Sequence, residues 1–151
     1  MTRLQTVGRF GKGTKKVAAV AAYEDSHTDS RVHEFCHNLA RCLGEQCEVS
    51  KQMWLINELR IPQLRVIAAR EAAAADMVIV SIHHAQSLPA EVKDWIELWV
   101  SEKRRRPVVL LALLDAAYRG DSNPLKTSLK EASAKAKIEF LAHSEEMADD
   151  D

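Results

Sequence analysis

The sequence predicts a three-layer α/β/α domain built on a parallel β-sheet, and two observations carry this prediction. Residues 17–23, 77–82 and 108–114 form continuous apolar runs, which are typical of strands that helices cover on both faces. The segments between these runs place apolar residues at helical spacing. A chain that alternates strand and helix in this way forms a doubly wound parallel sheet.

Two further segments complete the expected sheet as its edge strands. Residues 47–54 alternate between apolar and polar side chains, and residues 138–142 form a short run that includes Glu139. Both patterns indicate strands that are only partly buried. Placing them outside the three apolar strands gives five strands in the order 2-1-3-4-5, which is a flavodoxin-like sheet.

Four helices are expected between the strands. Apolar stripes mark the first helix (Val32, Cys36, Leu39 and Leu43) and the third (Val92, Ile96, Trp99 and Val100). Asp29 or Ser30 is the expected N-cap of the first helix, and Gly44 is its expected end. The alanine-rich segment 61–75 supplies the second helix, and Pro124 opens the fourth.

Length and composition fit one globular domain. The chain has 151 residues, of which 46% are hydrophobic and 28% charged, and its formal net charge is −1. Residues 16–144 form the expected domain, residues 1–15 a flexible basic arm and residues 145–151 an acidic tail. The nearly balanced charge gives no general attraction to nucleic acid or to an acidic membrane surface.

A cytoplasmic location is expected from the cysteines and from the lack of targeting segments. Cys36, Cys42 and Cys47 lie close together without the spacing of a disulfide framework or a zinc site, which fits reduced thiols. Residues 1–14 lack the apolar core of a secretory signal, and no apolar run is long enough to span a bilayer. We therefore expect no membrane partner.

The predicted functional edge lies at the switch point of the sheet, where the chain reverses direction between the first and third strands. Ligands of such folds bind beyond the carboxyl ends of these strands. The candidate ligand- or cation-binding residues there are Glu24, Asp25, Ser26, Ser81, His83, His84 and, after the fourth strand, Asp115. Paired carboxylates suit a divalent cation or a sugar hydroxyl, and histidines can act as acid, base or ligand. The alternative explanation is a polar loop that caps a helix, and we assign no catalytic residue and no cofactor.

One helical string formally matches a zinc-protease motif. Residues 33–37, His-Glu-Phe-Cys-His, place two histidines one turn apart with a glutamate beside the first. The apolar stripe through Val32 and Cys36 turns both histidines toward solvent. No further histidine follows at the extended zinc-protease spacing, and Glu58 is only a loose candidate for a third ligand. A solvated pair is therefore the favoured interpretation, and no metal site is expected.

Two tryptophans, Trp95 and Trp99, lie one turn apart in the third helix. Core packing explains them, and the alternative is a partner surface, because tryptophans are common anchors at interfaces. Residues 103–106 form a cationic run at the end of this helix. No aromatic platform accompanies the run, so we expect no nucleic-acid binding.

Residues 76–82 and 107–114, together with the acidic pair Glu24 and Asp25, resemble the receiver domain of two-component response regulators. In that family an acidic pair after the first strand binds magnesium, and an aspartate that ends the third strand accepts a phosphoryl group. Ser81 stands where that aspartate would be. The resemblance therefore implies a receiver relative that has lost phosphotransfer.

The same stretch is similar to TIR and SEFIR domains, through residues 23–26, residues 75–81 and a helix that carries tryptophan and glutamate. Those domains assemble signalling complexes, and some bacterial TIR domains cleave NAD with a helix glutamate. Glu97 is the nearest match to that glutamate, at a different spacing from the tryptophan. The chain most resembles an uncharacterised bacterial flavodoxin-like family with the same Tyr-Glu-Asp loop and Trp-Ile-Glu helix, and that resemblance implies no activity.

These resemblances favour a non-catalytic signalling or protein-interaction domain whose partner is another protein or a second copy of the chain. The alternative is an enzyme or binder for a small nucleotide or NAD, with its site at the carboxyl ends of the first and third strands. The missing catalytic groups favour the first hypothesis.

Overall fold

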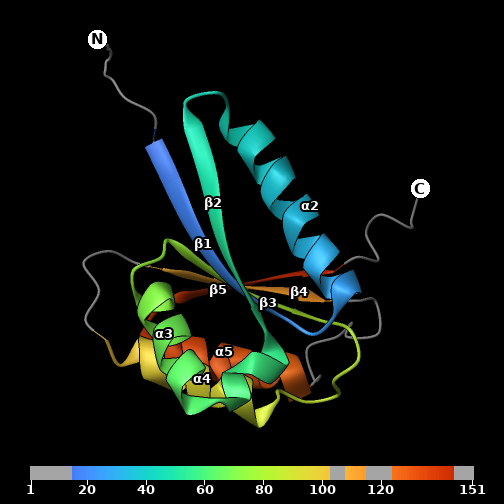
Figure 1. The fold of residues 1–151 in the computed structure, drawn as a ribbon, viewed down its shortest axis with the longest axis vertical. Helices are drawn as coiled ribbons and strands as arrows, with labels where there is room; N and C mark the ends of the chain where they lie inside the picture. The colour runs from blue at the N-terminus through green and yellow to red at the C-terminus, as the bar shows by residue number, and fades with distance from the viewer. Residues whose placement is uncertain (1–14, 103–107, 115–123, 145–151) are drawn as a thin grey trace.

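The computed structural model describes residues 15–102, 108–114 and 124–144, and its centre is a parallel β-sheet (Figure 1). The strands are β1 (Lys15–Tyr23), β2 (Cys47–Leu55), β3 (Met77–Ile82), β4 (Val109–Leu114) and β5 (Glu139–Ser144). They lie in the order β2-β1-β3-β4-β5, and all neighbours are parallel. The predicted sheet and strand order are confirmed.

Helices lie on both faces of the sheet, in unequal number. Among the described residues, α2 (Ser26–Leu43) covers one face, and α3 (Pro62–Ala73), α4 (Ala90–Val100) and α5 (Pro124–Ala136) gather on the other (Figure 1). A short 3₁₀ helix, η1 (Ile56–Arg60), joins β2 to α3. This arrangement confirms the three-layer α/β/α architecture.

Each face of the sheet has its own hydrophobic core. Val80 and Leu110 belong to the larger core beneath α3, α4 and α5, whereas Ile79 and Leu111 belong to the smaller core beneath α2. Neighbouring residues of a strand point to opposite faces. The interior strands are therefore apolar at nearly every buried position, which explains the long apolar runs in the sequence.

The outer strand β2 is polar at alternate positions because one of its faces is largely uncovered. Glu48, Ser50 and Gln52 are exposed, while the residues between them are half-buried. At the opposite edge Leu141 of β5 is exposed. Both strands are therefore edges, as predicted.

Helix α2 begins before the predicted N-cap. Asp25, and neither Asp29 nor Ser30, is the N-cap residue, and a reciprocal capping box joins Asp25 to Thr28. Asp29 lies instead in the first turn, where a carboxylate suits the positive end of the helix dipole. Gly44 ends the helix with a φ of 90°, as expected.

Several predictions fall on residues that the structure does not describe. Apart from Lys15, the predicted basic arm, residues 1–15, lies outside the described residues. The acidic tail, residues 145–151, the cationic run, residues 103–106, and Asp115 also lie outside them. Within the described part of the chain, no helix is both long enough and apolar enough to cross a bilayer.

Candidate functional site

The predicted switch-point residues meet at one end of the sheet. Tyr23, the last residue of β1, lies in register with Ser81 near the end of β3. The loop after β1 therefore faces the loop between β3 and α4, and the side chains of Glu24 and Asp25 contact His83. The meeting of these two loops follows from the strand order, as the sequence predicted.

The Glu24 carboxylate holds the β3–α4 loop. Its Oε1 accepts hydrogen bonds from the backbone N–H groups of His83, at 2.5 Å, and His84, at 2.8 Å. Its Oε2 accepts a third from the N–H of Ala85, at 3.0 Å. Both carboxylate oxygens are engaged with the chain itself. We call this arrangement the Glu24 clamp.

Asp25 serves two purposes at once. Its Oδ1 accepts the N–H of Thr28 at 3.1 Å and so caps α2, while its Oδ2 lies 2.7 Å from Nε2 of His83. Partial burial raises the pKa of Asp25. The hydrogen bonds from His83 and from the Thr28 amide lower it by more, so the pKa falls to about 2. Asp25 is therefore anionic at neutral pH, and its Oδ2 is the oxygen that contacts His83.

Thr28 is an essential part of this end of α2 that the sequence prediction did not include. Its Oγ1 accepts hydrogen bonds from the N–H groups of Glu24, at 2.8 Å, and Asp25, at 2.9 Å. The spacing Asp25-x-x-Thr28 was the available signal for this capping box. Thr28 fixes the backbone that carries both carboxylates.

Ser81 is a buried structural residue, which corrects its assignment to a ligand-binding surface. Its side chain is fully buried, and its Oγ donates a hydrogen bond to the carbonyl oxygen of Thr28 at 3.1 Å. Ser81 has the same parity in β3 as Ile79, so it points toward α2. Its hydroxyl joins the sheet to the first turn of α2, at the residue that also bonds Glu24 and Asp25.

The histidines of the β3–α4 loop gather beside Asp25. The ring centroids of His83 and His84 are 3.8 Å apart, and those of His27 and His83 are 4.6 Å apart. Nε2 of His84 lies 3.8 Å from Oδ2 of Asp25. One ligand atom each from Asp25, His83 and His84 falls within 4.8 Å of the others, so these three side chains could hold a metal ion. Asp25, His83 and His84 were among the residues predicted from the sequence, and His27 was not.

The remaining candidate at this edge, Ser26, is the exposed first residue of α2. A cation that bridged the two predicted carboxylates would share the Glu24 oxygens with the hydrogen bonds of the Glu24 clamp. The structure thus brings Glu24 and Asp25 close to His83 and His84, but the Glu24 carboxylate binds the backbone of the β3–α4 loop.

The two tryptophans of α4 are core residues, which corrects the partner-surface interpretation. Trp95 and Trp99 are both fully buried, and their ring centroids lie 6.3 Å apart in an edge-to-face arrangement. Their side chains pack in the larger core with residues of the sheet and of the neighbouring helices. Neither indole is available to an interface residue of another protein.

The two histidines of the zinc-protease-like string face solvent, as predicted, while Cys36 between them is buried. His33 and His37 are both exposed, and Nε2 of His33 lies 2.9 Å from Oδ1 of Asp29 one turn earlier. Neither belongs to a cluster of metal-ligating side chains among the described residues. The two histidines are therefore surface residues of α2.

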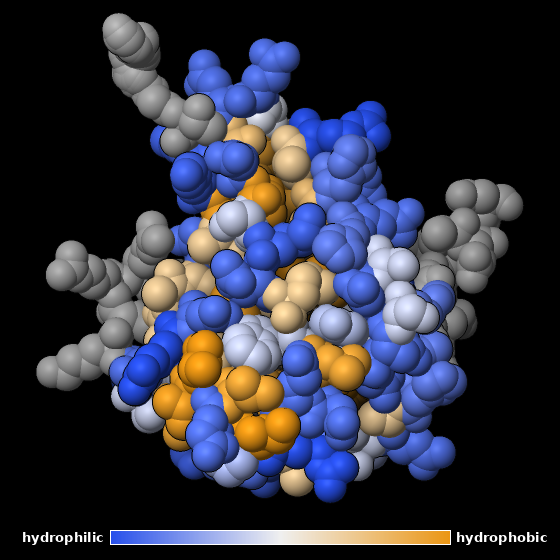
Figure 2. Space-filling model, in the orientation of Figure 1, coloured by the Kyte–Doolittle hydropathy of each residue, from blue (hydrophilic) through white to orange (hydrophobic). Residues whose placement is uncertain are grey.

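The exposed side of α3 carries an apolar patch that the sequence analysis missed. The small residues Ala68, Ala69 and Ala72 face the core, whereas Val66 and Ile67 are 40% and 45% exposed. Ile61, just before the helix, is also exposed. Figure 2 shows hydrophobic side chains gathered over the part of the surface that α3 occupies in Figure 1. We call Ile61, Val66 and Ile67 the α3 patch.

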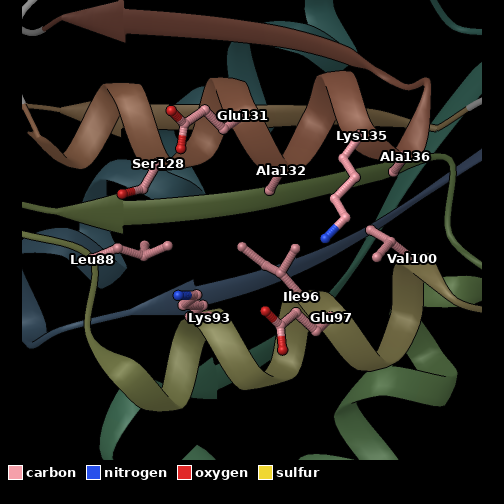
Figure 3. Close-up of a pocket in the computed structure, with 10 residues that line it drawn as sticks. All are labelled: Leu88, Lys93, Ile96, Glu97, Val100, Ser128, Glu131, Ala132, Lys135 and Ala136. Carbon is pink, nitrogen blue, oxygen red and sulfur yellow. The ribbon is translucent and has the colours of Figure 1, made fainter.

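A pocket of about 620 Å³ lies between α4 and α5, away from the two carboxylates (Figure 3). Its lining combines apolar side chains with two lysines and two glutamates: Leu88, Lys93, Ile96, Glu97, Val100, Ser128, Glu131, Ala132, Lys135 and Ala136. The volume lies in the range of small-molecule sites, roughly 300–1,000 Å³. The balanced charges select neither an anion nor a cation. Glu97, the residue that the TIR resemblance singled out, lines this pocket and not the switch-point loops.

No protein-family model matches the chain, and no curated protein matches it.

Proposed function

We propose that this chain is a non-catalytic protein-interaction domain, of the receiver-like or TIR-like signalling kind, that binds an acidic partner protein through the α3 patch. The observation that carries this proposal is the reversed burial of α3. A surface helix normally turns its large apolar residues toward the core, but α3 buries alanines and exposes Val66 and Ile67. Contiguous exposed apolar surface is typical of protein interfaces.

The charges around the α3 patch favour an acidic partner. Within residues 56–73, the exposed charged side chains are Arg60 and Arg70. The acidic residues of the same segment, Glu58 and Glu71, are half-buried and accept hydrogen bonds within the domain. The exposed arginines of this segment favour a partner surface of the opposite sign. A second copy docked through the same patch would bring arginines together, so a different protein is the better occupant.

The switch-point residues support a non-catalytic role. The Glu24 clamp engages both oxygens of one carboxylate, and Ser81 is buried where a receiver relative would carry its phosphorylated aspartate. A nucleotide or NAD site at these strand ends is the alternative function. The pocket between α4 and α5 is a separate place, because its lining includes neither Glu24 nor Ser81.

Capture from an extract of the source cells tests the interaction, with the immobilised full chain as bait. Ile67→Glu is the test variant, and Leu43→Glu is the matched control, because Leu43 is similarly exposed on α2 across the sheet. We expect one protein to be retained by the wild type and by the control, to be at least tenfold depleted with Ile67→Glu, and to be eluted by salt. Equal retention by all three baits would contradict the proposal.

Two further measurements separate the alternatives. Light scattering after size exclusion identifies self-association, and a dimer that Ile67→Glu dissociates would replace the acidic partner by a second copy. Incubation with NAD, ATP and GTP, followed by chromatography of the products, tests catalysis. Turnover of any of the three would refute the non-catalytic part of the proposal.

A further inference from the structure

We propose that Asp25, His83 and His84 form a binding site for a divalent transition-metal ion of the Zn²⁺ class. This proposal is independent of the proposed interaction function, because the metal site lies at the carboxyl ends of β1 and β3 and the α3 patch lies elsewhere. The three side chains come from the two loops that meet at the switch point, one residue from the β1 side and two from the β3 side.

The spacing of the ligand atoms fits a single ion. Oδ2 of Asp25 lies 2.7 Å from Nε2 of His83 and 3.8 Å from Nε2 of His84. Ligands that bind Zn²⁺ tetrahedrally at about 2.0–2.1 Å lie about 3.3 Å from one another. The two observed separations lie on either side of that value, so an ion needs side-chain shifts of about half an ångström.

The backbone that carries the ligands is already fixed. The second oxygen of Asp25, Oδ1, accepts the N–H of Thr28, which orients the carboxylate as outer-shell hydrogen bonds do in metal sites. The Glu24 clamp holds the backbone of both histidines, and the ring of His83 contacts the rings of His27 and His84. Metal binding therefore requires rotation of side chains and no refolding of a loop.

The donor set selects the class of ion. Two imidazole nitrogens and one carboxylate oxygen suit Zn²⁺, Co²⁺, Ni²⁺ or Cu²⁺, whereas Mg²⁺ and Ca²⁺ prefer oxygen ligands throughout. His84 is 74% exposed, so the remaining coordination positions open to solvent. The site differs from the magnesium site that paired carboxylates suggest, because Glu24 contributes to the loop and not to this cluster.

Calorimetric titration of the EDTA-treated full chain with Zn²⁺ tests the site, and Co²⁺ absorption in the visible region reports the coordination geometry. We expect one ion per chain, visible bands of a four- or five-coordinate Co²⁺ complex, and at least tenfold weaker Zn²⁺ binding for His84→Ala. The exposure of His84 makes this variant a mild change to the fold, and unchanged circular dichroism and unfolding temperature check that point.

The matched control is His37→Ala, since His33 and His37 form an exposed pair one turn apart that could chelate metal by itself. Unchanged Zn²⁺ affinity in His37→Ala and a loss in both His84→Ala and Asp25→Asn support the proposal. No saturable binding below about 100 μM Zn²⁺, or binding that is lost with His37→Ala and retained with His84→Ala, would overturn it.

Discussion

Removal of the Glu24 carboxylate is expected to destabilise the whole domain. The Glu24→Ala variant loses three hydrogen bonds to consecutive backbone N–H groups, at 2.5, 2.8 and 3.0 Å. Hydrogen bonds to charged groups contribute about 1.5–3 kcal/mol each, and neutral ones about 1 kcal/mol. Because water can reach part of this loop, we take about 1 kcal/mol per bond. The free energy of unfolding should therefore fall by about 3 kcal/mol.

The expected change is large enough to measure in two ways. For a chain of about 150 residues, 1 kcal/mol shifts the melting temperature by about 2–4 °C, so Glu24→Ala should melt about 6–12 °C below the wild type. Urea unfolding gives the free energy directly. Hydrogen exchange should also accelerate at the amides of His83, His84 and Ala85, since they lose their acceptor.

Two comparison variants separate the clamp from a general effect of lost charge. Glu24→Gln keeps one carbonyl oxygen but turns an amide toward a backbone N–H, so it should cost about 1–2 kcal/mol. Glu34→Ala removes an exposed carboxylate from α2 and should change stability by less than about 0.5 kcal/mol. A Glu24→Ala variant as stable as Glu34→Ala, with unchanged exchange in the loop, would refute the clamp.

Three other substitutions or treatments probe the described environments. Burial raises the pKa of Asp25, but its hydrogen bonds lower it to about 2 from an ordinary 3.8. The stability that Asp25 contributes is therefore present above about pH 4 and lost toward pH 2. Asp25→Asn should flatten the plot of unfolding free energy against pH between these values, and parallel plots for variant and wild type would contradict this. Burial also raises the pKa of the Cys36 thiol, so mass spectrometry after iodoacetamide at pH 8 should find the exposed Cys42 alkylated and Cys36 protected until urea is added. Trp99→Ala should lower stability by about 3–5 kcal/mol because it empties a buried site, and a melting temperature equal to that of Leu98→Ala would disprove this packing role.

The sheet could be predicted because burial leaves a direct record in the sequence. Residues 77–82 and 109–114 are covered on both faces, so nearly every position is apolar. β2 is covered mainly on one face, so it alternates. The N-cap of α2 was misplaced because Asp25, Asp29 and Ser30 are all good capping residues. The capping box with Thr28 decides between them, and that spacing was readable.

The position of the site could be predicted, but the contacts within it could not, because the residues that bond one another are distant in the chain. The acceptors and donors of the Glu24 clamp are separated by about sixty residues, and propensity and periodicity carry no information on such a pair. The burial of Ser81 could have been predicted, since alternate residues of a strand face the same side and Ser81 therefore shares the α2 side with Ile79. The α3 patch was missed because an alanine-rich helix does not indicate which of its faces is buried.

The Glu24 clamp also determines what this end of the sheet can recognise. Successive backbone N–H groups that converge on one point form a cradle for anions, as in many phosphate sites. In this domain the Glu24 carboxylate, which belongs to the chain itself, already occupies that cradle. An incoming phosphate or carboxylate would have to evict Glu24 and then overcome its repulsion from close range. The Glu24 clamp therefore occupies the N–H groups that an anionic ligand would need, and the metal site that we propose at Asp25, His83 and His84 would place a cation at the same edge.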